Sequence, residues 1–241
     1  MAVTEFKIEY SAVKSPHKNA VPVIIVAAGS SSRMGGINKM FTLLSGIPVI
    51  ARTMLNFERS PYVSEIVVVT KKESIADVLR LKEEYMISKL KVVTEGGRDR
   101  LSSVLNGLSV LSIDTKGVMI HDGARPLVSE ILIEKMAKAS LIFDCAVCGV
   151  PLKDTIKEKG DFVKTLDRSK MIAVQTPQSV NFIKYKELLS SIENKTEFTD
   201  DASVMESAGF NTKIIDGEES NIKITTPVDL KLAEALLKEE F

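Results

Sequence analysis

Hydrophobic runs and helix-like segments alternate along most of the chain. The first run, Val23 to Val26, is β-branched and bounded by small residues, which is typical of a strand buried on both faces of a parallel sheet. Further strands are expected at residues 65–70, 91–94, 118–120, 145–150, 211–216 and 221–225. Helices are expected at residues 48–57, 74–86, 99–111, 129–143, 181–193 and 199–208, and from residue 226 onward. This alternation predicts an α/β fold with an open, mainly parallel sheet and helices on both of its faces.

Capping residues set the expected ends of several helices. Ser74, followed three residues later by Asp77, resembles a capping box. Thr199 is expected to cap the helix that follows it, and the helix dipole favours Asp200 and Asp201 in the first turn. Capping is therefore a sufficient structural reason for both aspartates.

The alternating pattern breaks at residues 153–176. Gly160 separates two stretches of alternating hydrophobic and polar residues, which predicts a hairpin arm that projects from the body. Because the edges of such an arm are unpaired, we expect a homodimer that exchanges these arms. A simple surface flap is the alternative.

Small residues follow the first strand directly. Residues 27–32 read AAGSSS, so backbone N–H groups can approach a large anion without steric interference. Arg33 and Lys39 come next and would suit a polyphosphate. The alternative is a flexible loop with two solvated cations. The glycines match neither G-x-x-x-x-G-K-[ST] nor G-x-G-x-x-G, which excludes a P-loop and disfavours a dinucleotide fold.

Two further strand ends carry polar groups. Gly97 follows the strand at 91–94, and Ser103 lies in the first turn of the next helix. Asp122 ends the strand at 118–120 and is followed closely by Arg125. Since ligands of such sheets gather at the carboxyl ends of the strands, Asp122 is a candidate for a metal ion or a substrate hydroxyl. A structural ion pair between Asp122 and Arg125 is the alternative.

Composition points to a globular protein with a local anion site. The chain has 241 residues, of which 44% are hydrophobic and 27% charged, and this suits a single domain at 21–241 preceded by an amino-terminal tail at 1–20. The formal net charge of +0 argues against a general polyanion or membrane-surface binder. The tail carries charges and no hydrophobic centre, and no run approaches the roughly 20 apolar residues of a membrane span, so we expect a cytoplasmic location.

The only cysteines, Cys145 and Cys148, lie three residues apart in an expected strand. Residues at this spacing in a strand point to opposite faces, so the two thiols do not share a site. They are interpreted as inert core residues.

Five motifs together resemble those of the 2-C-methyl-D-erythritol 4-phosphate cytidylyltransferases of isoprenoid biosynthesis. They lie, in the family's order, at Ala27 to Lys39, His121 to Pro126, Thr176 to Gln178, Thr199 to Ser203 and Asn221 to Leu230. The resemblance covers about Val21 to Leu237 and implies a Rossmann-like fold and a homodimer. It also implies transfer of CMP from CTP to 2-C-methyl-D-erythritol 4-phosphate, with release of diphosphate and with Mg²⁺ as cofactor.

The resemblance implies roles for particular residues. The catalytic set is Arg33, Lys39, Arg168 and Lys223, with Arg168 reaching the neighbouring subunit's site. The positions matching nucleotide contacts are Ala27, Ala28, Gly29, Gly97 and Ser103. Those matching the acceptor site are Asp122, Arg125, Thr155, Thr176 and Thr199. Mg²⁺ is expected to be bound mostly through the CTP phosphates, with Asp122 as a protein ligand.

Three other functions compete with this one. Relatives that use D-ribitol 5-phosphate share most motifs, and Ala124 of HDGARP favours the methylerythritol enzymes over them. A non-catalytic CTP-binding homologue would need no acceptor residues. A dehydrogenase would need a glycine fingerprint and an acid after the second strand, where Lys71 and Lys72 stand.

Overall fold

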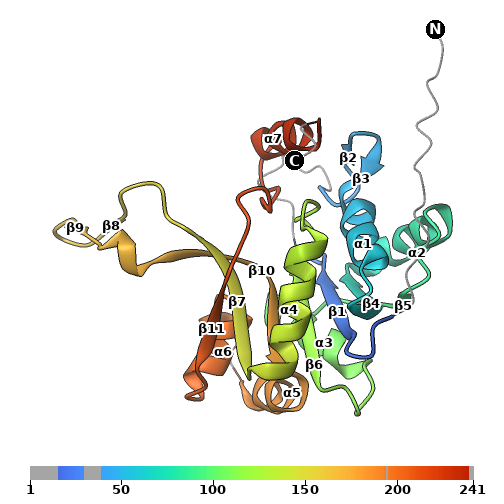
Figure 1. Ribbon diagram of the computed structural model, residues 1–241, viewed down its shortest axis with the longest axis horizontal. Helices are drawn as coiled ribbons and strands as arrows, with labels where there is room; N and C mark the ends of the chain where they lie inside the picture. Colours follow the sequence, from blue (N-terminus) through green and yellow to red (C-terminus); the bar gives the residue numbers. More distant parts are fainter. Residues whose placement is uncertain (1–15, 30–38, 194, 239–241) are drawn as a thin grey trace, which may run out of the picture.

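The structure, a computed structural model, describes residues 16–29, 39–193 and 195–238. A seven-stranded sheet forms its centre, in the order β11-β7-β10-β6-β1-β4-β5 (Figure 1). The strands are β1 (Val21–Val26), β4 (Val63–Thr70), β5 (Leu90–Glu95), β6 (Gly117–Asp122), β7 (Cys145–Pro151), β10 (Ile172–Asn181) and β11 (Thr212–Asp216). Every pairing is parallel except those of β10, which runs antiparallel to both β6 and β7. The predicted mainly parallel α/β sheet is confirmed.

Helices cover both faces of this sheet. One face carries α1 (Val49–Arg59), α2 (Ile75–Glu84) and α4 (Glu130–Ile142), and the other carries α3 (Arg100–Ser109), α5 (Phe182–Ser191) and α6 (Asp201–Ser207). Strand β1 supplies both cores, with Val23 and Ile25 on one face and Ile24 on the other, all fully buried. Each such side chain contributes about 1.5–3 kcal/mol of stabilisation on burial.

A third, small core lies over the carboxyl ends of the strands. Here α7 (Pro227–Lys238) packs beside the short pair β2 (Leu43–Leu44) and β3 (Ile47–Pro48), through Leu44, Val49, Ile224 and Ala233 (Figure 1). Short 3-10 helices lie at Lys72–Ser74, Arg168–Lys170 and Lys195–Glu197. Among the residues that the structure describes, no helix is long and apolar enough to cross a bilayer.

The arm projects from the body between β7 and β10 (Figure 1). Its outer part is a two-stranded ladder of β8 (Lys157–Glu158) and β9 (Lys164–Thr165). Phe162 and Val163, which lie between these strands, are 92% and 68% exposed. The predicted hairpin is therefore present, and its returning chain continues as β10 into the middle of the sheet.

Three local predictions are wrong. Ser74 does precede α2, but its side chain makes no cap hydrogen bond. The N-cap of α6 is Asp200 rather than Thr199, since the Asp200 carboxylate accepts from the Ser203 N–H in a capping box. Residues 221–225 do not form a strand. The N–H groups of Asn221 and Ile222 donate within their own turn, to the carbonyls of residues 218 and 220, and the Ile224 N–H donates to the Ala124 carbonyl.

The two cysteines behave as predicted. Cys145 packs in the core under α3, α5 and α6, whereas Cys148 packs in the core of the opposite face. Burial raises the pKa of each thiol to about 12, so neither is a reactive thiolate at neutral pH.

The described part of the amino-terminal tail contacts the loop before β4. The His17 N–H donates to the Pro61 carbonyl at 2.8 Å, and the His17 ring lies 5.3 Å from the Tyr62 ring. The division into a tail at 1–20 and one domain at 21–241 stays a prediction.

Candidate active site

The loops after β1 and β5 touch each other at the carboxyl edge of the sheet. A side chain added at Gly96 would place its Cβ 2.4 Å from the Cβ of Ala28 and 3.0 Å from the Ser103 hydroxyl. Only glycine allows this approach, because real Cβ contacts are not that short. The two glycine-containing loops predicted from the sequence therefore form one wall.

A pocket of about 370 Å³ opens beside this wall. Its lining includes Ala28, Gly29 and Gly97, which have small side chains or none. Five cations also line it: Lys39, Lys71, Arg98, Arg100 and Lys223. Among the residues that the structure describes, two carboxylates line it, Asp99 and Asp122. The pocket therefore carries a net positive charge that suits a polyphosphate.

These cations come from distant parts of the chain. Lys39 follows the loop after β1, Lys71 follows β4, and both arginines follow β5. Lys223 lies on residues 217–226, which lead from β11 to α7 and are called the strap below. Because the carboxyl ends of parallel strands meet at one edge, cations from four separate segments of the chain reach one pocket.

Asp122 is the anionic centre of the site. Its Oδ2 lies 2.7 Å from the Lys223 Nζ and 3.8 Å from the Arg125 Nε, and its Oδ1 lies 3.8 Å from the Arg100 Nε. Burial alone would raise the pKa of this carboxyl, but the charges of Lys223, Arg100 and Arg125 outweigh it and lower the pKa to about 2. Asp122 therefore stays ionised. The predicted ion pair with Arg125 is one of three that Asp122 makes with described residues, the others being with Arg100 and Lys223.

Arg100 was missed in the sequence. Its Nη2 lies 2.6 Å from the Asp201 Oδ2, and the Tyr185 hydroxyl donates to the Asp201 Oδ1 at 2.7 Å. Asp201 is fully buried, so this contact, and not helix capping, explains it. The available signal was an arginine directly after the N-cap Asp99, at the end of a glycine turn.

Some predicted nucleotide positions support the pocket from behind. Ala27 lies in the core, and its N–H donates to the Val69 carbonyl. The Ser103 hydroxyl accepts from the Gly97 N–H at 3.0 Å and donates to the Asp99 carbonyl at 2.9 Å. Ser103 therefore holds the glycine turn in shape.

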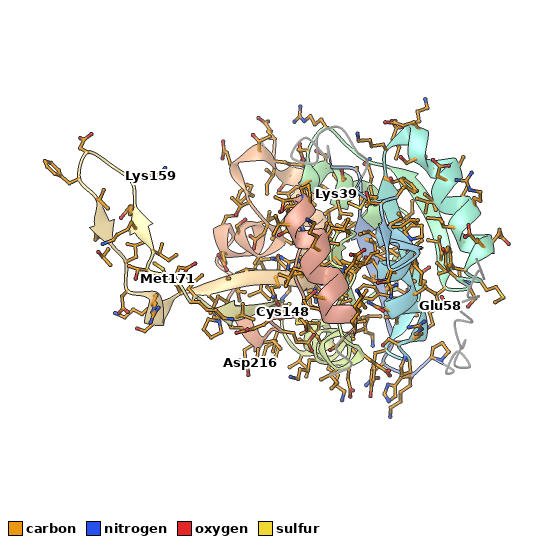
Figure 2. The ribbon with its side chains drawn as sticks, turned by 90° about the horizontal axis from the view of Figure 1, so that it is seen from above. Lys39, Glu58, Cys148, Lys159, Met171 and Asp216 are labelled. Carbon is orange, nitrogen blue, oxygen red and sulfur yellow. The ribbon has the colours of Figure 1, made fainter. Side chains whose placement is uncertain are left out.

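The predicted acceptor positions divide into three places. Arg125 and Thr176 are packed behind Asp122, and the Thr176 hydroxyl accepts from the Asp122 N–H at 3.0 Å. Thr199 is exposed just before α6. Thr155 and Arg168 are exposed on the arm. Figure 2 shows this arm, marked by Lys159 and Met171, extending away from the body that carries Lys39.

Arg33, the remaining catalytic candidate, lies outside the described residues, as does the serine run that precedes it. Lys39 and Lys223, which should share a cavity with it, do line the same pocket.

Comparisons with known proteins place the chain in a family. The family model described as 2-C-methyl-D-erythritol 4-phosphate cytidylyltransferase matches residues 21–239. A protein of that name from Dehalococcoides mccartyi is 42% identical over 224 residues, covering 91% of this chain and 96% of the relative. Another from Clostridium tetani is 42% identical over 241 residues, covering 97% and 96%.

Solved structures agree. The crystal structure of 4-diphosphocytidyl-2C-methyl-D-erythritol synthase from Anaerococcus prevotii matches with a TM-score of 0.80 and 29% identity, covering 91% of this chain and 96% of that one. The cytidylyltransferase structure from Thermus thermophilus matches with a TM-score of 0.74 and 27% identity, covering 91% and 99%. The fold, the cationic pocket and these matches agree with the resemblance found in the motifs: the chain belongs to the 2-C-methyl-D-erythritol 4-phosphate cytidylyltransferase family and is a nucleotidyltransferase.

Proposed function

We propose that this chain transfers CMP from CTP to 2-C-methyl-D-erythritol 4-phosphate in the pocket at the carboxyl edge of the sheet, releasing diphosphate for isoprenoid precursor synthesis. The observation that carries the proposal is the convergence of Lys39, Lys71, Arg98, Arg100 and Lys223 beside the Ala28–Gly29 and Gly96–Gly97 loops. The relatives' names support the choice of acceptor.

The chemistry needs charge and placement more than a catalytic base. The acceptor's phosphate oxygen is already an anionic nucleophile, so its attack on the α-phosphorus of CTP requires two anions to be brought together. As that bond forms, the bond to the leaving diphosphate breaks, and negative charge grows on the departing oxygens. Lys39 and Lys223, with Arg33, are proposed to neutralise this charge.

The remaining residues of the predicted site are proposed to bind and orient the substrates, some of them from outside the pocket lining. Ala27, Ala28, Gly29, Gly97 and Ser103 are proposed to form the nucleotide wall. Asp122, Arg125, Thr155, Thr176 and Thr199 are proposed to surround the acceptor. For Thr176 the proposal is indirect, because its hydroxyl is already engaged by Asp122 and His121.

Mg²⁺ is proposed to enter the pocket with CTP. Mg²⁺ sites of nucleotide enzymes commonly combine one or two carboxylates with substrate phosphates. Asp122 offers one ionised carboxylate there, and the described residues hold no group of three or more metal-ligating side chains. Asp122 therefore fits as one ligand beside phosphate oxygens. We expect EDTA to abolish activity and added Mg²⁺ to restore it.

Diphosphate release tests the reaction and its acceptor. The purified chain should release diphosphate from CTP with 2-C-methyl-D-erythritol 4-phosphate and far more slowly with D-ribitol 5-phosphate. A preference for the ribitol compound would reverse the acceptor. Binding of CTP without release in either mixture would identify a non-catalytic homologue.

Lys39→Ala tests the role of the pocket cations. We expect kcat to fall by about 100-fold with a modest change in KM, because the charge that Lys39 meets is largest in the transition state. Lys72→Ala is the matched control, since Lys72 is exposed beside the same sheet edge but does not line the pocket. Near-normal turnover of the Lys39→Ala variant would contradict the assignment.

We also propose a homodimer formed by arm exchange, with Arg168 acting on the acceptor phosphate in the partner's site. The exposed Phe162 and Val163 at the arm tip support this, since apolar side chains on a thin hairpin are stabilised by a covering partner. A cytoplasmic location remains a prediction from the sequence.

Mixed dimers test the exchange. An Arg168→Ala subunit combined with a Lys39→Ala subunit should regain one working site per heterodimer. No recovery after verified subunit exchange would contradict action in trans.

A further inference from the structure

A closed circuit of hydrogen bonds joins three segments behind the pocket. The Asn221 Nδ2 donates to the Thr176 carbonyl at 2.8 Å, and the Arg125 Nη1 donates to the Asn221 carbonyl at 2.7 Å. The Thr176 hydroxyl and the Arg125 carbonyl in turn bond the two ring nitrogens of His121, at 3.2 Å and 3.1 Å. The circuit therefore ties the end of β6, the middle of β10 and the strap together.

The direction of each bond in this circuit is fixed. The Arg125 carbonyl can only accept, so His121 carries a proton on Nε2. Complete burial disfavours a charged ring, so Nδ1 is unprotonated and accepts from the Thr176 hydroxyl. That leaves the Thr176 oxygen to accept from the Asp122 N–H at 3.0 Å.

Asn221 is the strap's member of the circuit. It is fully buried, and it lies two residues before Lys223. On the other side of Lys223, the Ile224 N–H donates to the Ala124 carbonyl at 2.8 Å. The strap is thus fastened to the rest of the site on both sides of the lysine. Lys223 itself is 40% exposed at its side chain and reaches the Asp122 carboxylate at 2.7 Å.

We propose that Asn221 is a positioning residue for Lys223: through Thr176 and His121 it fixes the strap to the same turn that carries Asp122, so that the lysine ammonium stays at the pocket. This inference rests on the proposed function of Lys223. A lysine on a strap without these bonds would sample many positions, and a misplacement of about 1 Å can cost on the order of 100-fold in rate.

Kinetics of a double-variant cycle test the proposal. Asn221→Ala removes the bond to Thr176, and we expect kcat to fall at least about tenfold with little change in the KM for CTP. In a Lys223→Ala background, the same change should cost less than about twofold, because the lysine that it positions is already absent. An equal loss in both backgrounds would overturn the proposal, as would full kcat in the single variant.

Thr176 provides a second perturbation should Asn221→Ala not fold. Thr176→Ser keeps the hydroxyl in the circuit, so its kcat should be clearly higher than that of Thr176→Val. Thr176→Val keeps the shape but leaves the Asp122 N–H and His121 Nδ1 without their partner, and it should lower kcat as Asn221→Ala does. Equal rates for the serine and valine variants would overturn the proposal.

Labelling of Lys223 with an amine-acylating reagent, followed by peptide mass spectrometry, gives a readout that needs no turnover. We expect Asn221→Ala to speed labelling at Lys223, because the ammonium spends less time at Asp122. Glu219→Ala is the control: Glu219 lies on the same strap, and its partner in the described part of the chain is the exposed Lys153, whose side chain is 73% solvent-accessible. Unchanged labelling in Asn221→Ala would overturn the proposal. Absence of diphosphate release by the unmodified chain would instead count against the proposed function, with labelling still deciding the role of Asn221.

Discussion

Asp201→Asn should destabilise the protein far more than the same change at the neighbouring Asp200, although the sequence predicted the same capping role for both aspartates. The Asp201 carboxylate is fully buried, with the Arg100 Nη2 at 2.6 Å and the Tyr185 hydroxyl at 2.7 Å. Asparagine keeps the size of the side chain but removes the charge. The Arg100 guanidinium, whose side chain is 27% exposed, then has Asp122, 3.8 Å away, as its one remaining carboxylate partner among the described residues.

The expected loss can be sized from the burial of the pair. Breaking a fully buried ion pair by removing one partner costs about 3–5 kcal/mol. Because Arg100 retains some exposure and a second carboxylate, we expect the lower end, about 3 kcal/mol. For a chain of this size, that corresponds to a fall in Tm of roughly 6–12 °C.

Asp200→Asn is the matched control. Asparagine caps a helix about as well as aspartate, so the α6 cap survives, and the bond from Gln178 to the Asp200 Oδ2 is the main loss. We expect at most about 1 kcal/mol. Urea unfolding of both variants, with unchanged m values, gives the two free energies. Equal losses for the two variants would refute the argument that Asp201 acts as the buried partner of Arg100.

Two further predictions concern His121 and Gly96. Burial lowers the pKa of His121 to about 4, so below pH 6.5 the unfolded chain binds a proton that the folded chain does not bind until about pH 4. The free energy of unfolding should therefore fall between pH 6.5 and pH 4, by at most about 3 kcal/mol. In urea unfolding of His121→Asn, this free energy should depend less steeply on pH. Gly96→Ala should push the Ala28 loop away, which should raise the KM for CTP and lower the free energy of unfolding by about 1–3 kcal/mol. Gly160→Ala is the control and should change neither quantity, because its added Cβ would meet the Phe162 carbonyl at an ordinary 3.7 Å. An unaltered KM in Gly96→Ala would count against the nucleotide wall.

The parallel part of the fold could be predicted because its sequence signal is local. The β-branched run of β1 and the similar run of β4 are buried on both faces, and such strands read as continuous hydrophobic stretches. Strand β10 is different. It contains Gln175, Pro177, Gln178 and Ser179, which do not favour strands. This segment is a strand because it pairs with β6 and β7 on its two sides. Only the first part of β10 fell within the predicted hairpin.

The site was predictable where one residue carried the signal. Asp122 and the glycines stand at or shortly after the ends of strands, Lys39 follows the loop after β1, and the structure brings them to one edge. Arg100 was missed because its partner Asp201 is 101 positions away, and neither residue is unusual where it stands. The circuit of Asn221, Thr176 and His121 was missed for the same reason, since each of its bonds joins segments that only the fold brings together.

Strand β10 also sets the order in which a nascent chain can complete the sheet. Since β10 lies between β6 and β7 in the sheet, the ribosome must extend the chain at least 30 residues past the end of β7 before the sheet is continuous, which takes roughly 2 to 6 s. During that interval the backbone N–H and C=O groups at the edge of β6 are unpaired and can bond a strand of another chain. The nascent chain is therefore most exposed to wrong strand pairing, and would gain most from a chaperone, until β10 has been made through residue 181 and can pair with β6 and β7.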